Sequence, residues 1–358
     1  MSIDHWSKIG ILEREIALYK KLIKKGVEIS FLTYGNSRDN KYKNKLGDIK
    51  ILCNAYNLPI KLYEFLIPIL HFKSFMNSQI LKTNQMNGSY ISLVISKIFQ
   101  KPLICRIGYL FSQFQLKRKG KQSKSYINAL KLESKIFQSS KINVVTTGLI
   151  KSQILENNKS IKKEKITVIP NYVDMDVFKP INSTDNRKKF DVLFIGRIAK
   201  QKNVNSLLIA VSKLKLKTHI VGDGNIKNNL QNEYQSKKIK WSENIPNTQL
   251  PKIYDSSKIF VLPSFYEGHP KTLIEAMSCG SAIIGANSPG IKNIINNEIN
   301  GILCDTDPDS IMERISYLLK NPKKRISIGK KARDDAINRY SLDKIAKIEF
   351  DLYSKLKN

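Results

Sequence analysis

The sequence predicts an α/β protein made of two Rossmann-like, doubly wound domains. Short apolar runs alternate with stretches whose apolar residues recur at helical spacing, a pattern typical of a parallel sheet covered by helices. The pattern pauses at residues 166–189, which hold two prolines and several Asn and Asp residues, and then restarts. A chain of 358 residues is also longer than one typical core. We therefore expect two domains joined by a linker near residues 175–190.

The first domain, residues 1–175, is expected to begin with a helix. Residues 10–25 carry apolar side chains at helical spacing, and Gly26 follows as a cap. The residues before Gly10 leave barely enough room for the strand that usually opens such a domain. Either the start of that strand has been lost or misassigned, or residues 2–5 are a remnant of it. The remaining pattern predicts strands at 27–35, 48–54, 78–83, 102–109 and 142–147 and helices at 89–99 and 125–140.

The second domain, residues 190–340, repeats the alternation. A final helix, residues 341–356, is expected to pack back on the first domain, so we treat residues 341–358 separately. Sheets of this kind bind ligands at the carboxyl ends of their strands, and we expect a central cleft between the two domains to hold the site. The pattern predicts strands at 190–196, 217–224, 258–264 and 281–286 and helices at 203–214, 248–257 and 272–279.

The net charge of +31 comes from 51 lysines and only 10 arginines, beside abundant Asn and Ile. Compositional bias explains this skew, and attraction to an anionic membrane face is the alternative. Within it, residues 116–135 form a basic segment that we interpret either as a peripheral lipid-binding surface or as a solvated, disordered loop. We expect no nucleic-acid partner, because the sequence shows no motif in which arginines, or aromatic residues set between basic ones, would contact bases and phosphates.

The cysteines and apolar runs favour a cytoplasmic protein. Its four cysteines are isolated, which predicts reduced thiols and neither a disulfide framework nor a zinc site. The first ten residues lack the apolar core of a secretory signal, and the apolar run at 65–70 is too short to span a bilayer. We expect a cytoplasmic location, with peripheral attachment to the inner face of the cell membrane as an extension of it.

Residues 194–203 form a candidate anion site. A strand ends at Gly196, and Arg197 and Lys202 flank a short loop before a helix that begins near Asn203. Such a loop offers backbone N–H groups and the positive end of the helix dipole. The two cations suit a diphosphate, although a solvated basic turn explains them as well. The glycine-rich turn at 222–224 adds a weaker signal.

Residues 265–280 place Glu267 and Glu275 eight positions apart around a glycine, a proline and a helix start. Pro270 suits the first turn of that helix, and Gly268 allows the backbone to approach a ligand closely. Glu275 is suited to accept hydrogen bonds from vicinal hydroxyls, and Glu267 to hold sugar hydroxyls or stabilise positive charge at an anomeric carbon. The alternative is a helix with Glu in its first turn for dipole reasons.

Taken together, these motifs resemble the second domain of the retaining GT-B glycosyltransferases of family 4. The similarity is strong over residues 166–320 and looser over 10–165, and Glu267 and Glu275 match the family's pair of glutamates spaced by seven residues. Tyr172 stands where the family often has Gly. The matching segments are "VIPNYVDMDVFKP", "GRIAKQKN", "VGDGN", "VLPSFYEGHPKTLIEAMSCGSAIIGANSPGIKNII" and "NGILCD".

The resemblance implies the GT-B fold and transfer of a sugar, with retention and usually without a metal, from a nucleotide diphosphate-sugar to a glycan or lipid-linked glycan. It implies no cofactor, and it makes Glu267 the catalytic residue, with Arg197 and Lys202 on the diphosphate and Glu275 on the ribose. The donor-binding residues it implies are Gly196, Arg197, Lys202, Gly268, His269, Lys271, Thr272, Leu273 and Glu275, and the acceptor-side candidates are Gly10, Asn84 and Arg106.

The first domain departs from the family pattern after the strand at 102–109. Many family members have a His there, whereas Gly108 and Tyr109 follow in this sequence, so Arg106 is interpreted either as a substitute or as a salt-bridged structural residue. Two other functions stay open: a GT-B epimerase or phosphorylase-like enzyme, and a non-catalytic basic protein that binds nucleic acid. The sequence does not indicate which base, sugar, acceptor or linkage is used.

Overall fold

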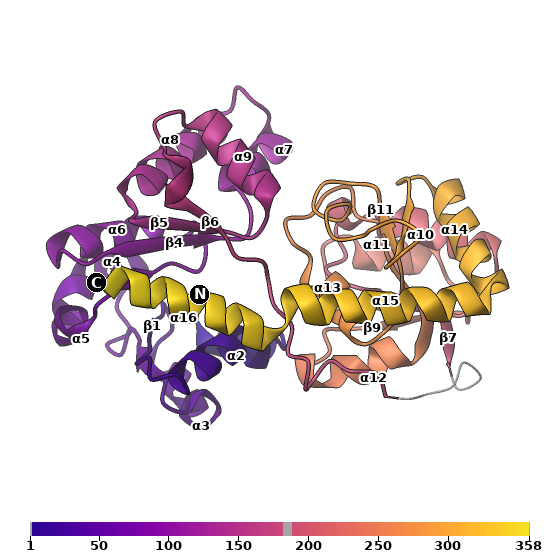
Figure 1. The fold of residues 1–358 in the computed structure, drawn as a ribbon, viewed down its shortest axis with the longest axis horizontal. Coiled ribbons are helices and arrows are strands. Elements are labelled where there is room, and N and C mark those ends of the chain that lie inside the picture. Colours follow the sequence, from indigo (N-terminus) through magenta and orange to yellow (C-terminus); the bar gives the residue numbers. More distant parts are fainter. Residues whose placement is uncertain (1, 182–187, 358) are drawn as a thin grey trace. The chain divides into compact units, whose positions relative to one another are not determined.

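The computed structural model describes residues 2–181 and 188–357. Its chain divides into two compact units. Unit 1 comprises Met1–His5, Leu18–Asn171 and Ile345–Asn358, and unit 2 comprises Trp6–Ala17 and Tyr172–Lys344 (Figure 1). Part of the predicted linker at 175–190, namely positions 182–187, lies outside the described residues.

Unit 2 contains a six-stranded, fully parallel sheet in the order β12-β11-β10-β7-β8-β9. The chain order runs outward from the centre in both directions, so the sheet is doubly wound and its topological switch point lies between β7 and β10. The apolar runs that predicted strands are buried on both faces, as parallel strands require. The strands are β7 (Phe190–Ile195), β8 (Thr218–Val221), β9 (Ile239–Ser242), β10 (Ser257–Leu262), β11 (Ala282–Ala286) and β12 (Ile302–Cys304).

The helices of unit 2 begin and end where local chemistry allows. Asn203 adopts a left-handed conformation (φ +53°) immediately before α10, and the Asp307 side chain accepts a hydrogen bond from the Ser310 N–H at the start of α14. Their buried faces pack on one core with the sheet. The helices are α10 (Val204–Lys213), α11 (Lys227–Glu233), α12 (Leu250–Asp255), α13 (Lys271–Ser278), α14 (Pro308–Lys320) and α15 (Pro322–Tyr340).

Unit 1 contains two parallel sheets. One pairs β1 (Ser30–Leu32) with β2 (Lys50–Leu52), and the other has the order β3-β4-β5-β6. In Figure 1 the helices α7, α8 and α9 gather above β4, β5 and β6. The remaining elements are β3 (Leu81–Lys82), β4 (Leu103–Ile107), β5 (Ile142–Val145), β6 (Ile166–Val168), α3 (Lys43–Leu46), α4 (Ile60–Leu70), α5 (Phe72–Asn77), α6 (Ser89–Ile98), α7 (Phe111–Lys119), α8 (Lys124–Ser139) and α9 (Gly148–Asn157).

Among the described residues, three helices contain residues of both units. Helix α1 (Ile3–Lys8) passes from unit 1 into unit 2 at Trp6. The first residues of α2 (Leu12–Ile23) belong to unit 2 and the rest to unit 1, and α16 (Leu342–Lys357) passes into unit 1 at Ile345. Within unit 1, the Lys82 ammonium on β3 forms an ion pair with Glu349 of α16 and donates to the Tyr353 hydroxyl at 2.8 Å. The last helix is therefore tied to the sheet of unit 1 by buried charged groups.

Several local predictions are wrong. Residues 2–5 are not a strand remnant, because Ile3–Lys8 form helix α1, where the Asp4 N–H donates to Asp39 and its carboxylate accepts from Tyr42. The basic segment at 116–135 is not a disordered loop, because most of its basic residues lie on α7 and α8. Lys121 lies in the turn between the two helices, and Ser123 caps α8. The sequence missed strand β9 and helix α11, where polar residues hide the pattern, and strand β6, which lies in the segment interpreted as a pause between the domains.

Candidate functional site

The loops that follow β7 and β10 meet at the switch point of unit 2. The two strands are parallel neighbours, with Val192 opposite Ile259. Beyond the strand ends, the Phe265 N–H donates to the Gln201 carbonyl at 3.0 Å, and the Gln201 side chain donates to the Tyr266 carbonyl at 2.7 Å. Backbone and side-chain bonds therefore hold the two predicted site loops side by side.

Lys202 and Glu267, one from each loop, form an ion pair. The Lys202 Nζ lies 2.5 Å from Glu267 Oε1, and the two side chains are 15% and 9% exposed. The Glu267 N–H donates to the Pro289 carbonyl at 2.8 Å, which also ties this loop to the segment after β11. The structure thus brings together the cation and the carboxylate that the sequence selected separately.

Arg197 lies exposed beside this pair. Burial raises the pKa of the Tyr266 hydroxyl, the Arg197 guanidinium opposes that rise and the Glu267 carboxylate adds to it, so all three groups lie close together. A planar, permanently charged guanidinium at the edge of these loops is suited to bind phosphate oxygens in a bidentate manner.

Two glycines allow the backbone segments of the site to come close together. Gly222 has a φ of +140°, and a Cβ on it would lie 2.0 Å from the Gly196 carbonyl oxygen. Gly290 has a φ of +84°, and its Cβ would lie 2.2 Å from the Glu267 carbonyl oxygen. Both positions therefore require glycine, and the close approach at Gly222 explains the first glycine of the turn predicted at 222–224.

Helix α13 presents its N-terminal end directly after the Glu267 loop. Pro270, its N-cap residue, has a hydrocarbon side chain that cannot accept a hydrogen bond, and the first helical bond runs from the Ile274 N–H to the Pro270 carbonyl at 3.4 Å. The N–H groups of Lys271, Thr272 and Leu273 therefore form the positive end of the helix. The Leu273 side chain itself is fully buried in the core.

Two further donor candidates lie in this loop. Gly268 is half-buried, and its carbonyl oxygen would lie 2.7 Å from a Cβ on Gly290. His269 is 8% exposed, and its ring packs edge-to-face against Tyr340 with 5.1 Å between the ring centroids. The imidazole is thus positioned by an aromatic side chain of α15.

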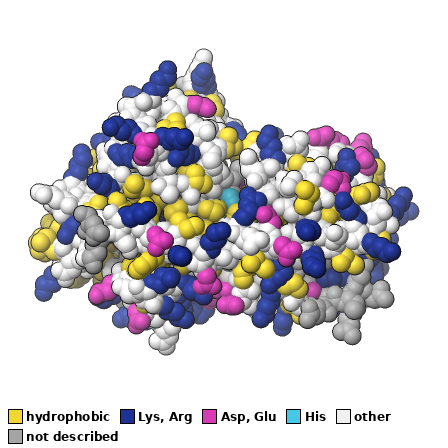
Figure 2. All heavy atoms as spheres, viewed as in Figure 1, with side chains coloured by type: hydrophobic (Ala, Val, Ile, Leu, Met, Phe, Trp, Pro, Cys, Tyr) yellow, Lys and Arg dark blue, Asp and Glu magenta, His cyan; other side chains and the backbone are white. Residues whose placement is uncertain are grey.

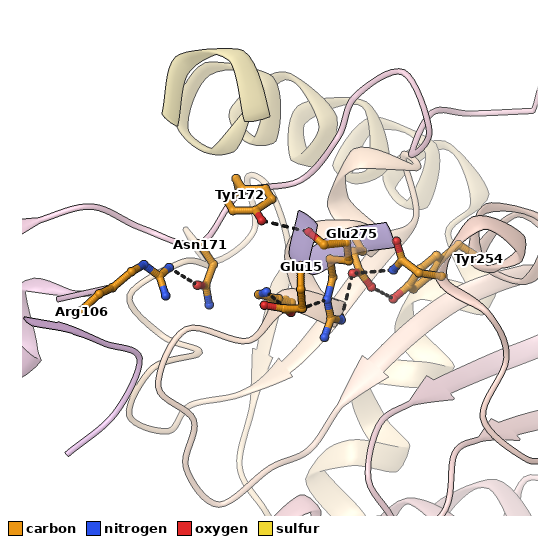
Figure 3. Close-up of polar contacts among 9 residues, drawn as sticks. Glu15, Arg106, Asn171, Tyr172, Tyr254 and Glu275 are labelled. Carbon is orange, nitrogen blue, oxygen red and sulfur yellow. Dashed lines mark hydrogen bonds and ion pairs between the residues drawn. The ribbon is translucent and has the colours of Figure 1, made fainter. Parts of the chain in front are cut away.

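Glu275 lies in a different polar cluster, which Figure 3 shows. Its side chain is 2% exposed, and its Oε2 accepts from the Tyr254 hydroxyl at 3.0 Å. Its Oε1 accepts from the Asn247 amide at 3.3 Å and from the Arg14 guanidinium at 3.4 Å. Burial and the Glu275 carboxylate raise the pKa of the Tyr254 hydroxyl, which keeps it protonated as a donor.

Arg14 extends this cluster along α2. Its Nε donates to Glu15 at 3.2 Å, and Glu15 in turn accepts from the Lys271 ammonium at 2.6 Å. The Tyr172 hydroxyl donates to the Arg14 carbonyl at 2.9 Å (Figure 3). Burial alone would lower the pKa of Arg14, but the two carboxylates outweigh it and raise that pKa.

Sequence reasoning missed the partners of Glu275. Arg14 lies 261 positions away in the chain, Asn247 directly precedes the helix predicted at 248–257, and Tyr254 belongs to that helix, for which no role in the site was predicted. The charged start of α2, Glu13-Arg14-Glu15, was the one available signal, because three charges in the first turn of an amphipathic helix call for partners.

The acceptor-side candidates fall into different surroundings. Gly10 belongs to unit 2, where its carbonyl accepts from the Asn247 N–H at 3.0 Å. Asn84 lies half-buried between β3 and α6 in unit 1. Arg106 is 8% exposed on β4, where its Nη2 donates to Asn171 at 3.1 Å and its Nε lies 3.9 Å from Glu349. These contacts favour a structural role for Arg106.

The described part of the chain contains no group of three or more His, Cys, Asp or Glu side chains that could hold a metal ion. Among the helices it describes, none is long and apolar enough to cross a membrane.

Comparison with known proteins identifies the type of domain that unit 2 resembles. Residues 178–335 match the family model for glycosyl transferases group 1. UDP-Gal:alpha-D-GlcNAc-diphosphoundecaprenol alpha-1,3-galactosyltransferase of Escherichia coli is 33% identical over 219 residues, which are 53% of this chain and 54% of the relative. N,N'-diacetylbacillosaminyl-diphospho-undecaprenol alpha-1,3-N-acetylgalactosaminyltransferase of Campylobacter jejuni is 33% identical over 110 residues, which are 30% and 29% of the two chains. The chain thus spans about half the length, or less, of these relatives.

Solved structures match nearly the whole chain. Sucrose-phosphate synthase from Thermosynechococcus elongatus has a TM-score of 0.78 at 18% identity and covers 95% of this chain and 91% of its own. Anabaena HepE in complex with UDP has a TM-score of 0.76 at 14% identity, covering 95% and 96%. A glycosyltransferase from Rickettsia africae has a TM-score of 0.73 at 23% identity, covering 97% and 95%. The protein has the GT-B fold, which confirms the predicted fold class.

Proposed function

We propose that the protein is a glycosyltransferase that moves a sugar from a nucleotide diphosphate-sugar to a glycan or a lipid-linked glycan. The observation that carries this proposal is the pairing of Lys202 with Glu267, beside Arg197, at the switch point between β7 and β10. Doubly wound sheets bind their ligands at this point. The family match at 178–335 includes these residues, and the names of two relatives specify acceptors linked to diphosphoundecaprenol.

In this proposal the diphosphate binds to Arg197, Lys202 and the first turn of α13. Negative charge grows on the diphosphate as the bond to the sugar breaks, and fixed cations and N–H groups stabilise that charge. The ion pair with Glu267 holds the Lys202 side chain at the junction of the two loops before the donor binds. Because these groups neutralise the leaving group, we propose that the reaction needs no metal.

The sugar is proposed to lie against Glu267, with retention of configuration at the anomeric carbon. The bond from the anomeric carbon to the phosphate oxygen breaks, the acceptor oxygen bonds on the same face, and the departing phosphate oxygen takes the acceptor's proton. Glu267 stabilises the positive charge that develops on the ring. The protein residues then bind and orient the substrates and stabilise the developing charges, and the departing phosphate accepts the acceptor's proton.

The ribose is proposed to bind at Glu275, and the protein donors of Glu275 limit how many hydrogen bonds it can accept from the ribose. A carboxylate has about four acceptor positions, and Arg14, Asn247 and Tyr254 occupy three of them. Glu275 therefore keeps one position for a pentose hydroxyl, and its protein donors fix its orientation.

The location of the protein follows from the same chemistry. We propose that it works in the cytoplasm, where its four cysteines, all buried and free, stay reduced. A lipid-linked acceptor would bring it to the inner face of the membrane.

Thermal unfolding with UDP-, GDP- and ADP-sugars tests the donor site. A donor at about one hundred times its Kd stabilises the native state by about 2.7 kcal/mol and raises the melting temperature. We expect this shift to vanish in Arg197→Ala and Lys202→Ala. Lys200→Ala is the matched control, because Lys200 is an exposed lysine of the same loop, and it should keep the shift. Equal shifts in all four proteins would rule out this site.

Product analysis separates transfer from the two related reactions. A glycosyltransferase consumes the donor only when an acceptor is present and retains the anomeric configuration in the product. Release of a free epimerised sugar, or a requirement for inorganic phosphate, would identify an epimerase or a phosphorylase instead.

A further inference from the structure

Helices α4 and α5 of unit 1 expose a row of large apolar side chains. Leu62, Phe65 and Ile69 are spaced by three and four positions, so they lie on one face of α4. Phe72 and Met76 continue the row on α5. Phe65 is 77% exposed, Ile69 69%, Phe72 54% and Met76 50%. We call these five residues the α4–α5 stripe.

The opposite face of the same helices is packed into a core. Tyr63, Ile67 and Phe75 are buried together with Ile95 of α6. The Tyr63 hydroxyl also donates to the Thr33 carbonyl at 3.2 Å, which fixes α4 to the strand region of unit 1. The stripe is therefore a second apolar face on helices whose first apolar face is already satisfied. A soluble protein rarely leaves such a contiguous face without a partner.

The surroundings of the stripe are cationic. Residues 60–77 contain one acidic side chain, Glu64, which is hydrogen-bonded to Tyr34. Lys61 and Lys73 lie exposed on the two helices. The sequence from 65 to 132 contains nine lysines and two arginines and neither Asp nor Glu. The partner of this face must therefore be both apolar and anionic.

Contacts on α6 and the segment after it connect the stripe to the basic helices. The Phe72 ring packs against Phe99 at 5.6 Å between centroids, and the Lys101 ammonium donates to the Met76 carbonyl at 2.9 Å. At the other end of α6, the Lys135 ammonium of α8 lies 5.1 Å from the Tyr90 ring centroid. Figure 2 shows lysines and arginines spread among apolar side chains on the visible face of unit 1.

We propose that the α4–α5 stripe inserts into the surface of an anionic lipid bilayer, with the neighbouring lysines on the head groups. Helices of 11 and 6 residues are too short to span the bilayer, so they lie in its interface. A second copy of this chain would bring like charges together, and nucleic acid offers no hydrocarbon for Phe65 and Ile69. The proposal requires no donor or acceptor and is independent of the proposed function.

Vesicle sedimentation of the full chain tests the proposal. The probes are vesicles of phosphatidylglycerol and phosphatidylcholine in equal parts and vesicles of phosphatidylcholine alone. The double variant Phe65→Ser/Ile69→Ser removes the two most exposed side chains of the stripe. Its matched control is Ile299→Ser/Ile326→Ser, two side chains of unit 2 that are 52% and 63% exposed. The charge variant Lys61→Glu/Lys73→Glu is matched by Lys323→Glu/Lys330→Glu on α15.

We expect the wild type and both controls to bind the anionic vesicles. Both Phe65→Ser/Ile69→Ser and Lys61→Glu/Lys73→Glu should lose affinity by about tenfold or more. Neutral vesicles should bind all proteins weakly, and added salt should weaken binding of the wild type only in part, because insertion of apolar groups is not screened. Unchanged binding of Phe65→Ser/Ile69→Ser would overturn the proposal. The proposal would also be overturned if the wild type bound a single-stranded oligonucleotide instead of vesicles and Lys61→Glu/Lys73→Glu abolished that binding.

Discussion

Replacement of Arg14 by Met is expected to destabilise unit 2 through Glu275. The Arg14 Nη1 lies 3.4 Å from Glu275 Oε1, and the two side chains are 20% and 2% exposed. At an effective dielectric constant of about 20, this separation corresponds to a gross attraction of about 5 kcal/mol. Loss of one partner of a buried pair costs about 3–5 kcal/mol, because it leaves the other charge without compensation. Asn247 and Tyr254 continue to donate to Glu275, so we expect the lower value, about 3 kcal/mol.

A double-mutant cycle isolates this interaction. For a unit of this size, about 3 kcal/mol lowers the melting temperature by about 6–12 °C. The cycle combines Arg14→Met with Glu275→Gln, and we expect a coupling free energy of about 1–3 kcal/mol, measured by thermal unfolding. Lys213→Met is the control, because Lys213 and Asp309 lie only 2.9 Å apart but are 55% and 72% exposed. An exposed pair contributes at most about 1 kcal/mol.

The comparison of Arg14→Met with Lys213→Met shows whether contact distance or burial determines how much an ion pair contributes to stability. If Lys213→Met costs as much as Arg14→Met, contact distance governs and the reasoning from burial is wrong. If the Arg14 and Glu275 substitutions are additive, the two side chains do not interact, and the segment Trp6–Ala17 is held to unit 2 by other contacts.

The remaining predictions concern backbone approach and acid stability. Gly222→Ala should cost at least about 3 kcal/mol of unfolding free energy, because its Cβ would lie 2.0 Å from the Gly196 oxygen. Gly26→Ala, with open space around it, should cost only about 1 kcal/mol. Equal melting temperatures for the two variants would contradict this prediction. Burial alone would raise the pKa of Glu349, but Lys82 and Arg106 outweigh it and lower that pKa. A carboxyl group with a depressed pKa stabilises the fold at any pH above the ordinary pKa of glutamate. This stabilisation is lost as the pH falls through the pKa of the group in the folded protein. The gap in melting temperature between wild type and Glu349→Gln should therefore narrow on acidification, and a constant gap would show that the charge of Glu349 is irrelevant.

The sequence predicted what local patterns determine. The strand that ends at Ile195, the turn at Asn203 and the helix after Pro270 follow from apolar periodicity and from Gly and Pro chemistry. It failed where tertiary contacts decide. Residues 2–5 are helical because Asp4 bonds to groups more than thirty positions away, and the short strand β9 has only a weak alternation to reveal it.

The candidate site was likewise predictable where neighbouring strands determine it and unpredictable where distant contacts do. Lys202 and Glu267 lie in the loops that follow the neighbouring parallel strands β7 and β10, and such loops meet at one edge of a sheet, so their proximity follows from the order of the strands. The partners of Glu275 come from α2, from the segment before α12 and from α12 itself. Periodicity identifies each of these elements but not the register in which its polar side chains meet.

The two glutamates of the motif therefore require different experiments. Glu267 has one cationic partner from the adjoining loop, so Glu267→Gln changes mainly the charge that a donor sugar would meet. Glu275 holds three donors from separate elements, so Glu275→Ala removes structural bonds together with any ribose contact. Loss of activity in Glu275→Ala alone is thus ambiguous. Tyr254→Phe resolves the ambiguity, because it leaves the carboxylate in place and removes one of its protein donors. If Glu275 binds ribose, the donor KM should rise in Tyr254→Phe by less than in Glu275→Gln, although the variant loses the buried hydroxyl that donates to Glu275.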